Sequence, residues 1–125
     1  MALPEQDEAY LEEKQYHWEL TAGAGEQLLI LCGYELPAGK YTPPIVDLLI
    51  RIPAGYPTHN PDMFFIAQVV QRVDGATPTA VTATNINGAT WHQWSRHYPP
   101  GLWRPGIDGL ETYLRAIRTE LEKGK

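Results

Sequence analysis

Apolar residues recur along the chain with two different periods, and each period predicts a different element. An amphipathic helix is predicted near the C-terminus, where apolar residues recur every three or four positions: Ile107, Leu110, Leu114, Ile117 and Leu121. Asp108 and Glu111 stand at the spacing of a capping box at the start of this run. The segment from Leu3 to Lys14 combines an early proline with acidic residues, which favours a short first helix.

Period-two and continuously apolar runs predict strands. The clearest strand covers residues 45–52, and its apolar side chains share one face: Val46, Leu48, Ile50 and Ile52. Further strands are predicted at residues 17–21, 26–36 and 62–67, and residues 68–90 read as a long irregular crossing with a short extended piece at 80–83. We predict an α+β fold with an N-terminal helix, a four-stranded antiparallel meander, this crossing and a C-terminal helix.

Length and charge restrict the function. A chain of 125 residues fits a single domain, which we place at residues 1–125. A net charge of −5 argues against nucleic acid as a partner. No apolar run is long enough for a membrane span, and the N-terminal sequence lacks the features of a signal peptide, so we expect a cytoplasmic protein without membrane contact.

Several phrases, taken in order, resemble one known family. They are Gly33-Tyr34-x-Leu36-Pro37, Asp47-Leu48-Leu49-Ile50-x-Ile52-Pro53-x-Gly55-Tyr56-Pro57, Pro61-Asp62-Met63-Phe64, Gly88-x-x-Trp91-x-x-Trp94-Ser95-Arg96-His97 and Trp103-Arg104-Pro105-Gly106-Ile107-Asp108-Gly109-Leu110. Over nearly its whole length the chain resembles the bacterial ubiquitin-conjugating-enzyme-like proteins, in particular the prokaryotic group called family E. The resemblance implies the ubiquitin-conjugating fold.

The same resemblance implies a set of partners. It points to a bacterial ubiquitin-like protein of the β-grasp type, a ThiF-type activating enzyme and a pathway with a JAB-type metalloprotease. The purpose that it implies for such a pathway is phage defence. The acidic residues of the first helix are expected to be solvated, or to meet a basic surface of the activating enzyme: Glu5, Asp7, Glu8, Glu12 and Glu13.

The residue that this fold uses for catalysis has no counterpart here. Ubiquitin-conjugating enzymes carry a cysteine shortly before the Trp-x-Pro element, which corresponds to residues 88–97 of this chain. That stretch contains no cysteine, and the family's His-Pro-Asn tripeptide is also missing, although Asn85 and Asn87 stand nearby. Cys32 is the one cysteine of the chain, and its place in an apolar strand predicts a buried, structural thiol.

Ser95 and His97 are the candidate catalytic residues. Ser95 is the one serine of the chain, and His97 lies on the same side of an extended segment, where it could serve as its base. The alternative is that Ser95 hydrogen-bonds the loop backbone. The spacing of His92 and His97, even with His59, carries no ligand signature, so we predict neither a metal there nor a cofactor.

Binding and structural roles fall to neighbouring residues. The aromatic and cationic cluster is predicted to contact a partner, although tryptophans are commonly core anchors: Trp91, His92, Trp94, Arg96 and Trp103. Structural roles are predicted for Cys32, Asp62, Tyr56, Pro57 and Pro61. Arg96 and His97 are expected to anchor the crossing, with Asp62 and Arg96 forming an ion pair.

Two functions remain open. In the first, the protein is a component of a bacterial ubiquitin-like pathway that binds the ubiquitin-like protein, its activating enzyme or both, without forming a thioester. In the second, it is an active transferase that uses a non-standard residue of the segment Trp94-Ser95-Arg96-His97, or, less readily, Cys32. A structural domain without any link to ubiquitin-like proteins is a third, more distant reading.

Overall fold

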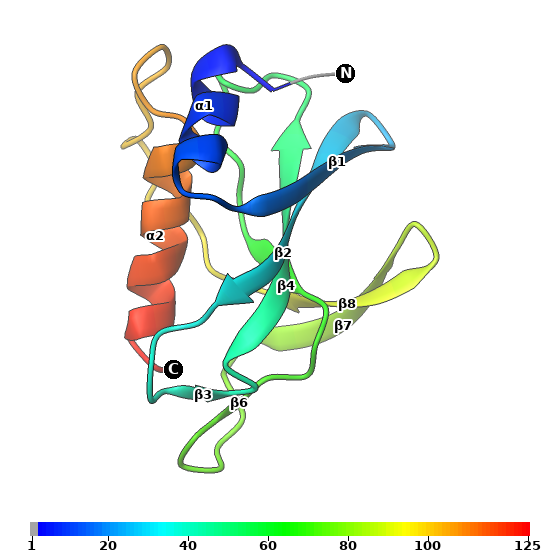
Figure 1. Cartoon of the computed structure of the whole chain (residues 1–125), viewed down its shortest axis with the longest axis vertical. Helices are drawn as coiled ribbons and strands as arrows, with labels where there is room; N and C mark the ends of the chain where they lie inside the picture. The colour runs from blue at the N-terminus through cyan, green and yellow to red at the C-terminus, as the bar shows by residue number, and fades with distance from the viewer. Residues whose placement is uncertain (1–2) are drawn as a thin grey trace.

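The computed structural model describes residues 3–125, and its two helices lie on the same side of an antiparallel sheet (Figure 1). Met1 and Ala2, the first residues of the predicted domain, lie outside the described residues. Helix α1 spans Glu5–Glu13 and α2 spans Leu110–Glu122, which confirms both predicted helices. Ile107 is an exception, because it precedes α2 and is 67% exposed.

The main sheet has six strands in the order β1-β2-β4-β5-β8-β7, and every neighbouring pair is antiparallel. The predicted meander forms its first part, with β1 (His17–Gly23), β2 (Glu26–Glu35), β4 (Ile45–Pro53) and β5 (Phe64–Ile66). The second part is a hairpin of β7 (Val81–Ile86) and β8 (Ala89–Trp94). A separate small sheet pairs β3 (Tyr41–Thr42) with β6 (Gln71–Arg72).

The β7–β8 hairpin corrects the prediction of a four-stranded sheet and of an irregular crossing at residues 68–90. Its turn is Asn87-Gly88, and both residues have positive φ angles, 50° and 83°. This dipeptide favours the tight hairpin turn whose twist matches that of the flanking strands. The hairpin adds β8 to the free edge of β5, which leaves residues 95–109 as the irregular segment that leads into α2.

Apolar side chains are buried on both faces of the sheet. The larger core lies between the sheet and the helices. Its sheet residues include four fully buried side chains: Leu29, Leu31, Leu48 and Ile50. A smaller cluster covers the opposite face: Leu28, Leu49, Phe65, Ile86 and Trp91. Because side chains alternate along a strand, Leu28, Ile30 and Cys32 face away from the helices.

Asp7 holds the two helices and the Tyr-Pro turn together. Its carboxylate accepts a hydrogen bond from the Tyr56 hydroxyl at 2.5 Å and another from the backbone N–H of Leu110, in the first turn of α2, at 3.2 Å. The side chain is 4% exposed, so Asp7 is not part of a solvated acidic face as expected. The predicted capping box of Asp108 and Glu111 is also wrong, since Asp108 binds Arg104 and Thr112 instead.

Candidate functional site

The candidate site is built by residues 95–109, here called the pre-helix segment, where they pass over α2. It begins where β8 ends: the backbone N–H of Ser95 donates to the carbonyl of Ala80 at 3.0 Å. Between this segment and α2 lies a hollow of about 310 Å³. Its lining combines apolar groups with cationic ones, and includes Phe64, Arg96, His97, Leu102, Tyr113 and Arg115.

Asp62 anchors the start of the pre-helix segment. One carboxylate oxygen lies 2.7 Å from Nδ1 of His97, and the other accepts the backbone N–H of Tyr98 at 2.8 Å. The expected anchoring by His97 is therefore present, but the ion pair of Asp62 with Arg96 is wrong. Arg96 instead donates to the carbonyls of Thr79 and Lys125, at 2.8 and 2.9 Å, and its guanidinium lies over the Trp94 ring.

Aromatic rings fix the middle of the segment. Tyr98 packs against Trp103 at 5.5 Å between ring centroids and against Tyr113 of α2 at 6.3 Å. The Trp103 indole N–H donates to the carbonyl of Pro57 at 2.8 Å, so the Tyr-Pro turn supports this ring. The Tyr113 hydroxyl donates to the carbonyl of Met63 at 2.6 Å. The rings hold the outer wall of the hollow against the sheet.

Asp108 closes the segment immediately before α2. Its side chain is 3% exposed and accepts hydrogen bonds from the backbone N–H and the guanidinium of Arg104, and from the hydroxyl of Thr112. The Arg104 side chain and backbone N–H hold the pKa of Asp108 at about 2, although burial acts in the opposite direction. The carboxylate is therefore ionised at neutral pH and belongs to the support of the loop.

Ser95 and His97, the predicted catalytic residues, begin the pre-helix segment, and their geometry supports only part of a catalytic arrangement. Asp62 orients the imidazole of His97 through Nδ1, which is how a carboxylate positions a general base. The His97 side chain is 65% exposed, and Ser95 is half-buried. The site thus has an oriented imidazole two residues after Ser95, and the role of Ser95 as a nucleophile stays a prediction.

Two of the tryptophans that are predicted to contact a partner are buried. Trp94 is 1% exposed and stacks on Phe64 in the larger core, while Trp91 is 8% exposed and lies in the smaller cluster on the other face. β8 places the two rings in the apolar clusters on opposite faces of the sheet, so a contact of either ring with a partner stays a prediction. His92 is half-buried, with Nδ1 3.3 Å from the carbonyl of Ile66. Of this set, Arg96 lines the hollow, whereas Trp103 is held by the Tyr-Pro turn and packs against Tyr98.

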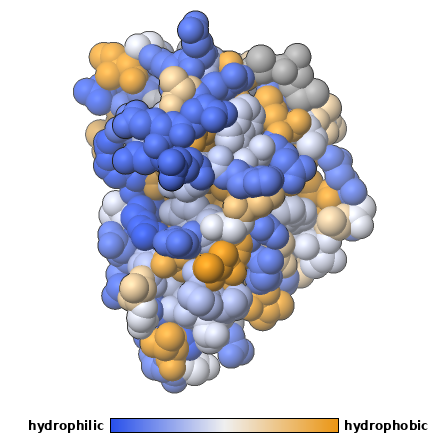
Figure 2. All heavy atoms as spheres, in the orientation of Figure 1, coloured by the Kyte–Doolittle hydropathy of each residue, from blue (hydrophilic) through white to orange (hydrophobic). Residues whose placement is uncertain are grey.

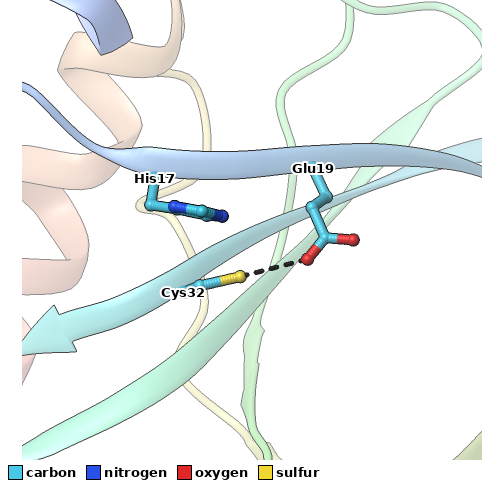
Figure 3. Close-up of side chains that lie close together, drawn as sticks. All are labelled: His17, Glu19 and Cys32. Carbon is cyan, nitrogen blue, oxygen red and sulfur yellow. Dashed lines mark hydrogen bonds between the residues drawn. The ribbon is translucent and has the colours of Figure 1, made fainter.

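Cys32 lies on the face of the sheet opposite the helices and the pre-helix segment. Contrary to the expectation of a buried thiol, its side chain is half-buried, since Cys32 lies outside the apolar cluster on that face. Its Sγ donates to the Glu19 carboxylate at 3.3 Å (Figure 3). Desolvation, followed by this hydrogen bond, raises the pKa of the thiol to about 11.

Sequence reasoning missed two groups of residues that the structure brings forward. Leu102 and Tyr113 line the hollow, and the inward-facing period of α2 could have identified Tyr113. On the other face, His17 and Glu19 lie beside Cys32. The alternation of side chains along residues 17–19 places them on one face, which is the signal that was available in the sequence.

The protein is an α+β protein, with an antiparallel sheet backed by an N-terminal and a C-terminal helix. A Tyr-Pro turn braces the segment before the last helix. The family model of Prokaryotic E2 family E matches residues 3–124, and the chain belongs to this family. Membership indicates a component of a bacterial ubiquitin-like pathway. No curated protein and no solved structure matches the chain. Within residues 3–125, neither helix is both long and apolar enough to cross a bilayer.

Proposed function

We propose that the protein binds a ubiquitin-like protein, alone or together with its ThiF-type activating enzyme, without carrying a thioester. The observation that carries this proposal is the location of the one thiol. Cys32 lies on β2 and faces away from the helices, whereas the pre-helix segment lies against α2 on the helix side. A thioester on Cys32 would therefore form away from the surface that the ubiquitin-conjugating fold uses.

The hollow beside α2 supports binding at this surface. Leu102 is 60% exposed at its rim, and Ile107 of the same segment is 67% exposed. Apolar spheres stand out at the upper left of Figure 2, where Figure 1 places this segment beside α1. Arg96, Arg115 and the acidic Glu120 also line the hollow. Arg115 pairs with Glu111 and Arg96 donates to two carbonyls, so the carboxylate that ends a ubiquitin-like protein would compete with these partners for the two guanidiniums. The pre-helix segment, held near its two ends by Asp62 and Asp108, presents Arg96 and Leu102, whereas Arg115 comes from α2.

The test is a titration of the ubiquitin-like protein into the purified chain by isothermal titration calorimetry, in the presence and absence of the activating enzyme. Leu102→Glu is expected to weaken binding about tenfold or more, because it places a charge in an apolar contact, and tenfold in affinity corresponds to a loss of about 1.4 kcal/mol. Val73→Glu is the matched control: Val73 is also 60% exposed but lies at the β6 turn. Equal affinities of the two variants, or no binding by the unmodified chain, would contradict the proposal.

The orientation of His97 by Asp62 favours a second candidate function, transfer through Ser95. In this reaction the Ser95 hydroxyl attacks the thioester on the activating enzyme, His97 takes the hydroxyl proton, and the cysteine of the activating enzyme leaves as a thiolate. The ubiquitin-like protein then rests on Ser95 as an oxyester. An alkali-labile adduct that Ser95→Ala abolishes would support this function over binding alone.

A further inference from the structure

Three potential metal ligands converge on the outer face of β1 and β2. They are His17, Glu19 and Cys32, and one ligand atom of each lies within 4.8 Å of the others. Figure 3 shows the imidazole and the carboxylate reaching from β1 toward the thiol of β2. His17 and Glu19 are exposed and Cys32 is half-buried, so the cluster is open to solvent. It lies on the face of the sheet opposite the hollow and takes no part in the proposed binding surface.

The register of the sheet explains why these side chains meet. His17 is the Cα partner of Cys32 across the antiparallel pair, and side chains directly opposite each other stand about 4.5 to 5.5 Å apart at Cβ. Glu19 is two residues further along β1, so its side chain emerges on the same face. A shift of one residue in the pairing of β1 with β2 would place these side chains on opposite faces of the sheet. The arrangement therefore depends on the register of the sheet and not on a flexible loop.

An irregularity in β2 separates Cys32 from the next strand. The register of β2 with β4 shifts between Leu31 and Tyr34, and Gly33 takes a φ angle of 75°. The Gly33 N–H donates to the Asp47 side chain on β4 at 3.2 Å. Cys32 is thereby left outside the ladder with β4, and such bulges commonly re-aim a side chain at a functional site.

The distances fit a small tetrahedral ion. Zinc lies about 2.3 Å from a thiolate and about 2.1 Å from a carboxylate oxygen, which places the two ligand atoms about 3.6 Å apart in a tetrahedron. The Cys32 Sγ and the nearer Glu19 oxygen are 3.3 Å apart. All three ligand atoms lie within 4.8 Å of one another, and the His17 and Glu19 side chains are exposed, so they have room to rotate toward a shared centre.

We propose that His17, Glu19 and Cys32 form a three-ligand site for a zinc-type divalent cation, with water in the fourth position. On binding, the thiol loses its proton to the solvent and the cation takes the place of that proton between Cys32 and Glu19. One thiolate and one carboxylate then balance the charge of the ion. The nearby carboxylate of Asp47 adds to the negative potential, but its oxygens are occupied by Gly33 and Gln68.

The ligand types determine which cations are accepted. Thiolate and imidazole are ligands for zinc and cobalt, whereas magnesium and calcium require a shell of oxygen ligands. Structural zinc sites are closed by four protein ligands, while sites with three keep one position open for water or a substrate group. Because only three protein ligands are present here, we predict an ion whose fourth position is accessible to water or to a substrate group.

The test is a titration of the tag-free, reduced full chain with Zn²⁺ by calorimetry and with Co²⁺ by absorption. One ion per chain is expected, with a sulfur-to-cobalt charge-transfer band and the strong visible bands of a tetrahedral ion, while Mg²⁺ gives no heat. Cys32→Ser, His17→Gln and Glu19→Gln are each expected to weaken binding by at least about 10- to 100-fold, and Cys32→Ser to remove the charge-transfer band.

Matched controls come from residues outside the cluster. His59→Gln and Glu122→Gln alter an exposed histidine and an exposed glutamate elsewhere, and both are expected to bind like the unmodified chain. Absence of stoichiometric zinc binding would overturn the proposal. So would equal affinity of the cluster variants and the controls, or a cobalt complex without the sulfur band. None of these results depends on the ubiquitin-like protein, so the two proposals fail separately.

Discussion

At the scale of single residues, Asp62 connects the sheet to the pre-helix segment. Asp62→Ala removes the partner of both His97 and the Tyr98 N–H. The pair with the 65% exposed imidazole contributes little, so most of the expected loss, about 1 kcal/mol, comes from the backbone hydrogen bond. The free energy of unfolding measured with urea should fall by this amount, and the Tyr98 amide should exchange its hydrogen faster.

Asp74 provides the matched control for Asp62. It also pairs with a cation, Arg72, and accepts a backbone N–H, that of Ala76, but in the turn after β6. Asp74→Ala should leave the exchange of the Tyr98 amide unchanged. Equal exchange rates for Tyr98 in the unmodified chain and in Asp62→Ala would contradict the anchoring role.

Asp7 is the residue whose loss should destabilise the protein most directly. Asp7→Ala leaves the Tyr56 hydroxyl and the Leu110 N–H without their acceptor in a buried place. Because hydrogen bonds to a charged group contribute about 1.5 to 3 kcal/mol each, we expect a loss of about 3 kcal/mol in unfolding free energy. Glu12→Ala changes an exposed carboxylate of the same helix and should be nearly neutral in the same urea titration. Similar midpoints for the two variants would be inconsistent with this account.

At the scale of elements, the β7–β8 hairpin depends on its turn. Gly88 has a φ angle of 83°, and a Cβ there would meet no other atom within 4 Å. Gly88→Ala is therefore expected to destabilise the protein through backbone strain alone, by about 1 to 2 kcal/mol. Asn87→Gly at the preceding position of positive φ should be tolerated. The measurement is thermal unfolding, and equal melting temperatures of Gly88→Ala and Asn87→Gly would refute the prediction.

The start of α2 should respond to acid through Asp108. Its pKa is about 2 in the folded protein, below the ordinary value of 3.8, so its ionised form stabilises the folded state. This contribution is complete above pH 4 and is lost as the pH falls toward 2. Asp108→Asn should lower the melting temperature at pH 7 and weaken its dependence on pH between 4 and 2. An identical pH profile of the two proteins would argue against the Arg104–Asp108 contact.

The local pattern of apolar and polar residues was sufficient to predict some strands and not others. The period of Val46, Leu48, Ile50 and Ile52 identifies β4 because one face of that strand is fully buried. The β7–β8 hairpin was missed because β7 shows a polar, mostly exposed side, and only its Asn-Gly turn marks it.

The candidate site was predictable in its location but not in its contacts. Asp62 was expected to bind Arg96, whereas neighbouring residues of an extended segment point to opposite sides, and His97 is the one that faces Asp62. The burial of Trp94 likewise depends on its place in β8, which pairs with β5 far away in the sequence. Such contacts between distant segments are fixed by the fold and leave no local pattern.

At the scale of the whole molecule, the protein combines two separate surfaces on one sheet. The hollow lies between α2 and the braced pre-helix segment, and the opposite face carries the one thiol within the His17, Glu19 and Cys32 cluster. This separation is the physical basis for our proposal that this member of Prokaryotic E2 family E binds a ubiquitin-like protein without transthiolation.

The most direct test of this account is the intact mass of the protein after incubation with its activating enzyme, the ubiquitin-like protein and ATP, without added reductant. The account predicts an unchanged mass, together with co-elution of the two proteins in size-exclusion chromatography. A mass increase equal to the ubiquitin-like protein minus one water would contradict it. Loss of that adduct in Ser95→Ala or Cys32→Ser would then identify the residue that carries it.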